Sequence, residues 1–192
     1  MCKFPQERLI LLKLAKRDQN IRIHGDFERV ETILKMSKID LANQKQLEKI
    51  LKIIKTPTTI NIGEDGAEAV WLIAQHSGYN LRLMKRILQL MRQATKVNPK
   101  NGYYKGIPYL VDRINIMEGK PQVFGTQFWA SPNGKPEPYP IVDENKVEGL
   151  RRLYGIRPFS EYQKDILKSN TRDKRNIYMF VYWKKIYQYP RP

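Results

Sequence analysis

Apolar residues recur at helical spacing along most of the chain and predict its regular elements. The clearest helix is expected over residues 41–55. Its Leu47, Ile50 and Ile54 stand at positions i, i+3 and i+7, which is typical of an amphipathic helix. Pro57 ends it, because proline disfavours a helical backbone at the preceding residue.

A first helix is predicted over residues 5–22 and is expected to end before Gly25. Leu9, Leu12 and Lys16 share one face of this helix, within a wide apolar stripe.

Residues 65–77 are apolar nearly all round, so we expect a central, buried helix there. Asp65 and Glu68 have the spacing of a capping box at its start. Asn80 is expected to cap the next helix. The core-facing residues of that helix are Met84, Ile87, Leu88 and Met91.

The second half of the chain alternates helices with a hairpin. Pro108 suits the first turn of a helix over residues 107–117. Residues 122–129 alternate enough to predict a strand, which gives a hairpin near residues 121–141. Two further helices are expected, one capped by Asp143 and closed at Gly155, the other over residues 160–168.

Together these elements predict a mainly α fold with a small β-hairpin (α+β) and a helical bundle-like core. A single globular domain is expected over residues 7–168. Residues 169–192 form a basic, aromatic C-terminal segment, in which Ile177 to Trp183 are continuously apolar. We expect this run to be a buried strand or a segment docked on a partner.

Polar residues interrupt the apolar elements at three places. Gln75 and His76 end the buried helix, Asp112 and Arg113 lie inside a later one, and residues 122–127 read Gln-Val-Phe-Gly-Thr-Gln. A buried polar group without a partner costs roughly 1–3 kcal/mol. Keeping several such groups therefore indicates a hydrogen-bond network or a functional site.

Composition adds a strong positive charge. The chain of 192 residues has 35 Lys plus Arg against 19 Asp plus Glu, a formal net charge of +16. Such a charge suggests an anionic partner: nucleic acid, an acidic membrane surface or a phosphorylated ligand. The alternative is that the charge reflects a biased genome and maintains solubility, and its even spread along the chain favours that reading.

The sequence favours a cytoplasmic protein without a transmembrane segment. Its longest apolar stretches are shorter than the roughly 18 residues that a membrane span needs. Lys13 breaks the first apolar stretch, which therefore does not read as a secretion signal. The single cysteine, Cys2, excludes an intramolecular disulfide and suits a reducing compartment.

His76 is the best candidate for acid/base chemistry, because histidine titrates near neutral pH and this one belongs to a buried element. Asp112 is expected to orient its ring. The alternatives are a core histidine bonded to a backbone carbonyl and, for Asp112 and Arg113, an internal salt bridge that involves Asp18. His24, the second histidine, is expected at the surface.

The first functional hypothesis is a small enzyme or ligand-binding protein that acts on an anionic ligand. Arg22 and Arg113 would hold the anion, since guanidinium groups pair with carboxylates and phosphates. Gln75 and Gln127 would orient the ligand, with Asp18 as a further contact. No cofactor is identified, and a metal would need His76 together with Asp18 and Asp112.

Two alternatives remain. Nucleic acid could bind the basic face at Arg82, Lys85, Arg86 and Arg92, with Tyr178, Tyr182 and Trp183 stacking on bases. The other is an interaction module whose C-terminal apolar run docks a partner. Nothing in the sequence determines the oligomeric state.

Six motifs follow one another in an order that carries a family resemblance. They are Asp18-Gln19-Asn20-Ile21-Arg22, Gly63-Glu64-Asp65-Gly66, Trp71-Leu72-Ile73-Ala74-Gln75-His76, Leu110-Val111-Asp112-Arg113, Gln122-Val123-Phe124-Gly125-Thr126-Gln127 and Arg151-Arg152-Leu153-Tyr154-Gly155-Ile156. This order resembles a bacterial family of unknown function, domain of unknown function 6624, from about Glu7 to Tyr162. The resemblance implies functional positions rather than a chemistry. These positions are Asp18, Gln19, Arg22, Gln75, His76, Asp112, Arg113, Gly125, Thr126 and Gln127. Phe124 replaces the tyrosine expected before Gly-Thr-Gln, so a phenol role is not implied there.

Overall fold

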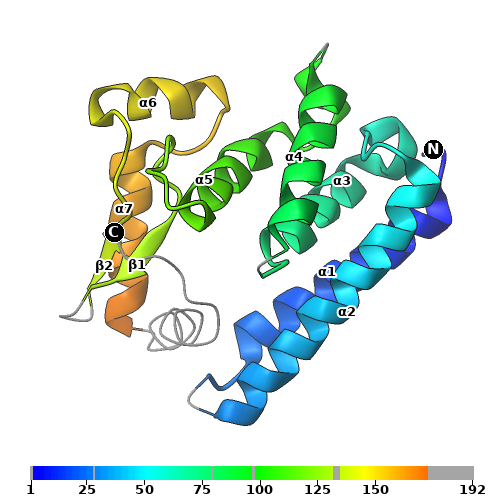
Figure 1. Cartoon of the computed structure of the whole chain (residues 1–192), viewed down its shortest axis with the longest axis horizontal. Helices are drawn as coiled ribbons and strands as arrows, with labels where there is room; N and C mark the ends of the chain where they lie inside the picture. The colour runs from blue at the N-terminus through cyan, green and yellow to red at the C-terminus, as the bar shows by residue number, and fades with distance from the viewer. Residues whose placement is uncertain (1, 28, 79, 97, 132–134, 173–192) are drawn as a thin grey trace.

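Two long helices pack side by side at the N-terminal end of the computed structural model (Figure 1), which describes all residues except 1, 28, 79, 97, 132–134 and 173–192. They are α1 (Pro5–His24) and α2 (Val30–Ile54). α2 begins well before the predicted residue 41. Ile33, Met36 and Asp40 continue its buried stripe at helical spacing, and the charge of Asp40 hides that stripe in the sequence.

The buried face of α1 differs from the predicted one. Leu11, Leu14 and Asp18 are buried, whereas Leu9 is 48% exposed and Lys16 is exposed. The apolar residues of this helix indicated the wrong face, because the buried face includes the carboxylate of Asp18.

The central helix α3 (Thr59–Gln75) packs against α1, α2, α4 and α5, as its apolar composition predicts. Its cap is Thr58, whose side chain accepts from the Asn61 N–H, so the predicted capping box at Asp65 is wrong. Gly63, with φ +73°, kinks the helix, and Asp65 pairs with Arg8 instead.

α4 (Leu81–Thr95) and α5 (Ile107–Met117) complete the main core (Figure 1). Asn80 caps α4 and Pro108 lies in the first turn of α5, both as predicted. Two short 3₁₀ turns, η1 (Pro99–Asn101) and η2 (Tyr104–Gly106), connect them.

The hairpin is shorter than predicted. β1 (Phe128–Ala130) pairs antiparallel with β2 (Pro136–Pro138), and Phe128 lies opposite Pro138. Residues 122–127 form a loop rather than a strand, because several of their backbone N–H groups donate to the Asp112 side chain. Residues 132–134, between the two strands, lie outside the described residues.

α6 (Glu144–Leu153) and α7 (Phe159–Arg172) cover the hairpin end of the molecule (Figure 1). Asp143 caps α6 as predicted. The mainly α fold with a small hairpin is thus confirmed. Residues 173–192, with the apolar run Ile177 to Trp183, lie outside the described residues. No described helix has both the length and the apolar composition that crossing a membrane requires.

Gly125 provides a test of the loop. Its φ is +65°, and an added Cβ would lie 2.6 Å from the Phe159 ring. We expect Gly125→Ala to lower the free energy of unfolding by about 2 kcal/mol, because backbone strain adds to this clash. Urea unfolding followed by circular dichroism measures the change.

Gly149 in α6 is the matched control, since no atom lies within 4 Å of its added Cβ. Gly149→Ala is expected to stabilise the protein by about 0.5–1 kcal/mol, because alanine is the better helix former. Equal stability of the two variants would contradict the described loop conformation.

Candidate functional site

His76, the C-terminal cap of α3, pairs with a buried carboxylate of α1. Its Nδ1 lies 2.8 Å from Oδ2 of Asp18, whose side chain is 1% exposed. The same carboxylate accepts from Nε2 of Gln19 at 2.9 Å and from Nη1 of Arg22 at 2.8 Å. Asp18 is therefore fully engaged and holds the imidazole ring in one orientation.

Arg22 joins this pair to α2. Its Nη2 lies 2.9 Å from both carboxylate oxygens of Asp40, and its Nη1 also donates to the Asp18 carbonyl. All three side chains are at most 8% exposed. The result is a buried network that connects α1, α2 and the end of α3.

Burial sets the protonation states of this network. Burial and, to a smaller extent, the charge of Arg22 lower the pKa of His76 to about 4, although Asp18 opposes the shift. Burial also works to raise the pKa of Asp18, but its hydrogen bond with His76 and the charge of Arg22 outweigh that effect and lower it. For Asp40, burial raises the pKa to about 7 despite the adjacent guanidinium.

At neutral pH the ring of His76 is therefore uncharged. The ionised Asp18 accepts the Nδ1–H, which leaves Nε2 with a free lone pair. Among the described residues, none forms a hydrogen bond with Nε2, and the side chain is 19% exposed. A neutral imidazole held in this way can accept a proton or a hydrogen bond from a ligand.

Arg113 of α5 lies near His76, since its charge also lowers the pKa of that ring. In the described part of the chain Arg113 has neither an ion pair nor a hydrogen bond, and its Nε is buried. The predicted internal salt bridge to Asp18 is formed by Arg22 instead.

Facing positions of α3 and α5 hold further polar atoms without partners. Trp71 packs edge-on against Tyr109 at 5.8 Å, and Gln75 donates weakly to the Tyr109 carbonyl at 3.4 Å. Within the described residues, Nε1 of Trp71 and Oε1 of Gln75 are buried without a hydrogen bond. Arg113, which follows Tyr109 by one turn of α5, adds a third unsatisfied group to this pair of helices.

Asp112 does not orient His76, so that prediction is wrong. Its fully buried carboxylate accepts from the backbone N–H groups of Val123, Phe124 and Thr126 and from the Thr126 hydroxyl. Asp112 is one residue from Arg113 and so points about 100° away from it on the helix. Its role is to fix the loop.

Gln127 also belongs to the loop. Its Nε2 donates to the Thr126 hydroxyl, and its backbone N–H donates to Oε1 of Gln122. A contact between Gln127 and a ligand stays a prediction. Phe124, at the expected tyrosine position, is buried edge-on against Tyr154.

Sequence reasoning missed Arg151, which is fully buried. It donates to the carbonyls of Phe124 and Arg157, and its guanidinium lies 4.9 Å from the ring centroid of Tyr162. Burial raises the pKa of Tyr162 to about 12, so its phenol stays protonated and donates to the Thr126 carbonyl. The motif that contains Arg151 was recognised, but nothing in it indicated burial.

The four predicted nucleic-acid contacts divide between two grooves. Arg82 and Arg86 line a groove of about 760 Å³ between α2 and α4, whereas Lys85 and Arg92 line one of about 550 Å³ between α4 and α5. Glu118 neutralises Lys85. No group of three or more His, Cys, Asp or Glu side chains in the described residues could hold a metal ion.

The titration of His76 tests the network. We expect its ring to stay neutral as the pH falls from 7 to about 5 and to titrate near pH 4, because burial opposes protonation. Asp18→Asn should lower this pKa further, since the Asp18 charge favours the protonated ring. NMR of the imidazole nitrogens reports both the pKa and the tautomer.

His24, exposed at the end of α1, gives the second set of ring signals and serves as an internal reference. A midpoint for His76 near the ordinary value of about 6.5 would contradict the described burial.

Asp112→Asn tests whether this carboxylate is structural. We expect a loss of about 2 kcal/mol in the free energy of unfolding, because an amide nitrogen would face backbone N–H donors. The His76 ring signals should stay where they are. Asp143→Asn, the same change at the α6 cap, should leave stability nearly unchanged, since asparagine caps equally well. A shifted His76 resonance in Asp112→Asn would restore a direct role at the site.

Comparison with known families gives one match, and comparison with curated proteins and with solved structures gives none. The matching model is described as "Family of unknown function (DUF6624)" and covers residues 5–171, which include every residue of the network around His76. The chain therefore belongs to this family of unknown function.

Proposed function

We propose that the protein binds a small anionic ligand beside the end of α3, where Arg113 holds the anion and His76 exchanges a proton with it. One observation carries this proposal: Arg113 lies near His76 with its Nε buried, and no described residue pairs with it. Arg113 is half-buried, and leaving its buried Nε–H without an acceptor is costly. An anion from outside the chain would satisfy it.

The side chain of Gln75 defines the ligand further. Oε1 of Gln75 is a buried acceptor without a partner in the described structure. It suits an O–H or N–H donor next to the anionic group of the ligand. The ligand class that fits is therefore a small acid with an adjacent hydroxyl, amine or amide group.

His76 supplies the chemistry that the site offers. Its Nε2 lone pair can take a proton from the bound donor, while Asp18 stabilises the imidazolium that results. Arg22 and Asp40 act as positioning residues, since they reach His76 only through Asp18. The low pKa of His76 keeps the ring neutral at neutral pH, but it also makes the ring a weaker base.

Titration with citrate, which carries carboxylates beside a hydroxyl, tests the proposal. We expect the His76 ring signals to move to saturation, whereas those of His24 stay fixed. Arg113→Gln should weaken the binding at least tenfold, because charge-assisted hydrogen bonds contribute roughly 1.5–3 kcal/mol.

Arg152→Gln is the matched control, since Arg152 is exposed on α6 and the change removes the same charge. Inorganic phosphate and lactate serve as further probes of the anion. The proposal fails if no probe moves the His76 signals, or if Arg113→Gln binds as tightly as Arg152→Gln.

A further inference from the structure

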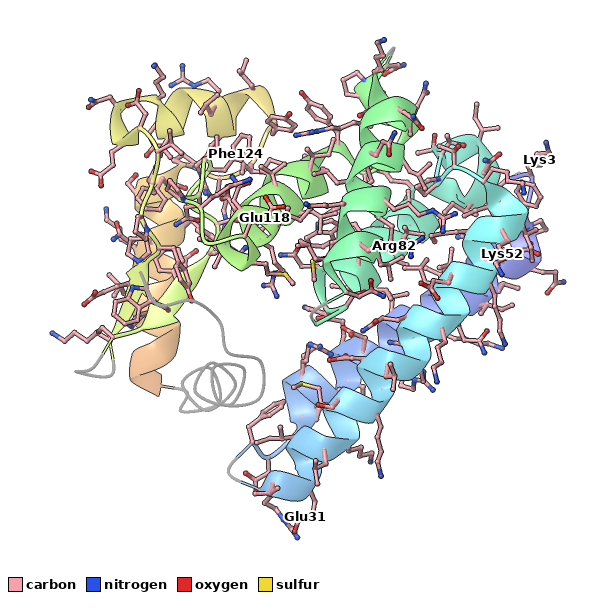
Figure 2. The ribbon with its side chains drawn as sticks, in the orientation of Figure 1. Lys3, Glu31, Lys52, Arg82, Glu118 and Phe124 are labelled. Atoms are coloured by element: carbon pink, nitrogen blue, oxygen red, sulfur yellow. The ribbon has the colours of Figure 1, made fainter. Side chains whose placement is uncertain are left out.

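A groove whose lining does not include His76 lies between α2 and α4. Figure 2 labels Lys52 on α2 and Arg82 on α4, the two helices that form its walls. The groove measures about 760 Å³. Its lining residues are Lys45, Glu48, Lys49, Lys52, Asn80, Arg82, Leu83 and Arg86.

The five cations of this groove form two ladders. Lys45, Lys49 and Lys52 stand at i, i+4 and i+7 on α2. Arg82 and Arg86 stand at i and i+4 on α4. Each ladder therefore lines one wall of the groove.

These cations have no acidic partners. Within the described residues none of the five forms an ion pair, although all are exposed and Glu48 lies among them. Lys85, on the other side of α4, is neutralised by Glu118. The positive charge of α4 is thus left uncompensated on the side that faces α2.

We propose that this groove binds the sugar-phosphate backbone of a nucleic acid strand without regard to its sequence. The α2 ladder spans about 10 Å at 1.5 Å per residue. That length spans about three nucleotides of a strand stacked as in a duplex, which rises roughly 3.4 Å per nucleotide. Five lysine and arginine side chains then meet successive phosphates from both sides.

The lining of the groove argues against recognition of bases and against binding to a membrane surface. It contains no aromatic side chain, so bases are not stacked there and binding depends on phosphates alone. The side chain of Asn80 is occupied, since it caps α4 and contacts Gln44. A concave, polar groove also fits a strand better than the flat surface of a membrane.

Salt dependence measures the number of phosphate contacts. For a fluorescein-labelled single strand, five contacts give a slope of log K against log[salt] of about −3.5, which is roughly a hundredfold loss of affinity between about 50 and 200 mM salt. The combined variant Lys45→Gln, Lys49→Gln, Lys52→Gln should bring the slope to about −1.4. Fluorescence anisotropy measures both quantities on the full chain.

Two controls separate the groove from net charge. The combined variant Lys13→Gln, Lys16→Gln, Lys35→Gln removes the same charge from exposed positions outside the groove, and we expect its slope to stay near the wild-type value. Glu48→Gln removes the only acid of the groove and should raise the affinity. All these side chains are exposed, so the fold is expected to be retained.

Four outcomes would overturn the proposal. One is no binding of the strand at low salt, and another is an equal loss of affinity in both triple variants. A third is a Glu48→Gln variant that binds no more tightly than wild type. The fourth is binding to vesicles of phosphatidylcholine and phosphatidylserine that depends on the same lysines, without binding of the strand. That result would assign the groove to a membrane surface.

Discussion

The arrangement of the N-terminal half depends on one buried guanidinium. Arg22 holds Asp18 of its own helix and Asp40 of α2, and Asp18 in turn holds His76 at the end of α3. Three helix positions are thereby fixed by charge-assisted hydrogen bonds among buried side chains. Removing Arg22 would leave two buried carboxylates, Asp18 and Asp40, without their cation, so the network constrains geometry more than it adds stability.

Helix periodicity and cap residues together identified most of the fold, because α3, α4 and α5 each present a wide apolar face and Asn80, Pro108 and Asp143 mark helix starts. It failed where charges occupy core positions. Because Asp18 is charged, the buried face of α1 was inferred wrongly, and because Asp40 is charged, the first half of α2 was not predicted as helix. A pattern that counts carboxylates as solvent-facing cannot find helices whose cores contain an ion pair, since only the partner Arg22 makes those positions tolerable.

Sequence reasoning named His76 as a candidate but assigned it the wrong carboxylate partner. The charge of Arg113 acts on the His76 ring, yet the carboxylate that orients this ring comes from α1, far away in sequence. Asp112 was assigned to the ring because both interrupt apolar helices. Its true partners are backbone N–H groups, which carry no sequence signal. Loop residues 122–127 consequently read as a strand, although their hydrogen-bond donors were already committed to a side chain.

Asp112 and Arg113 are neighbours on the single rigid helix α5, and they point to different parts of the molecule. One holds the loop that leads into the hairpin, and the other lies near the ring at the end of α3. A rotation of α5 would therefore disturb both ends at once. A substitution at either position therefore needs two readouts, loop stability and the His76 ring signals, to separate a structural effect from an effect at the candidate site.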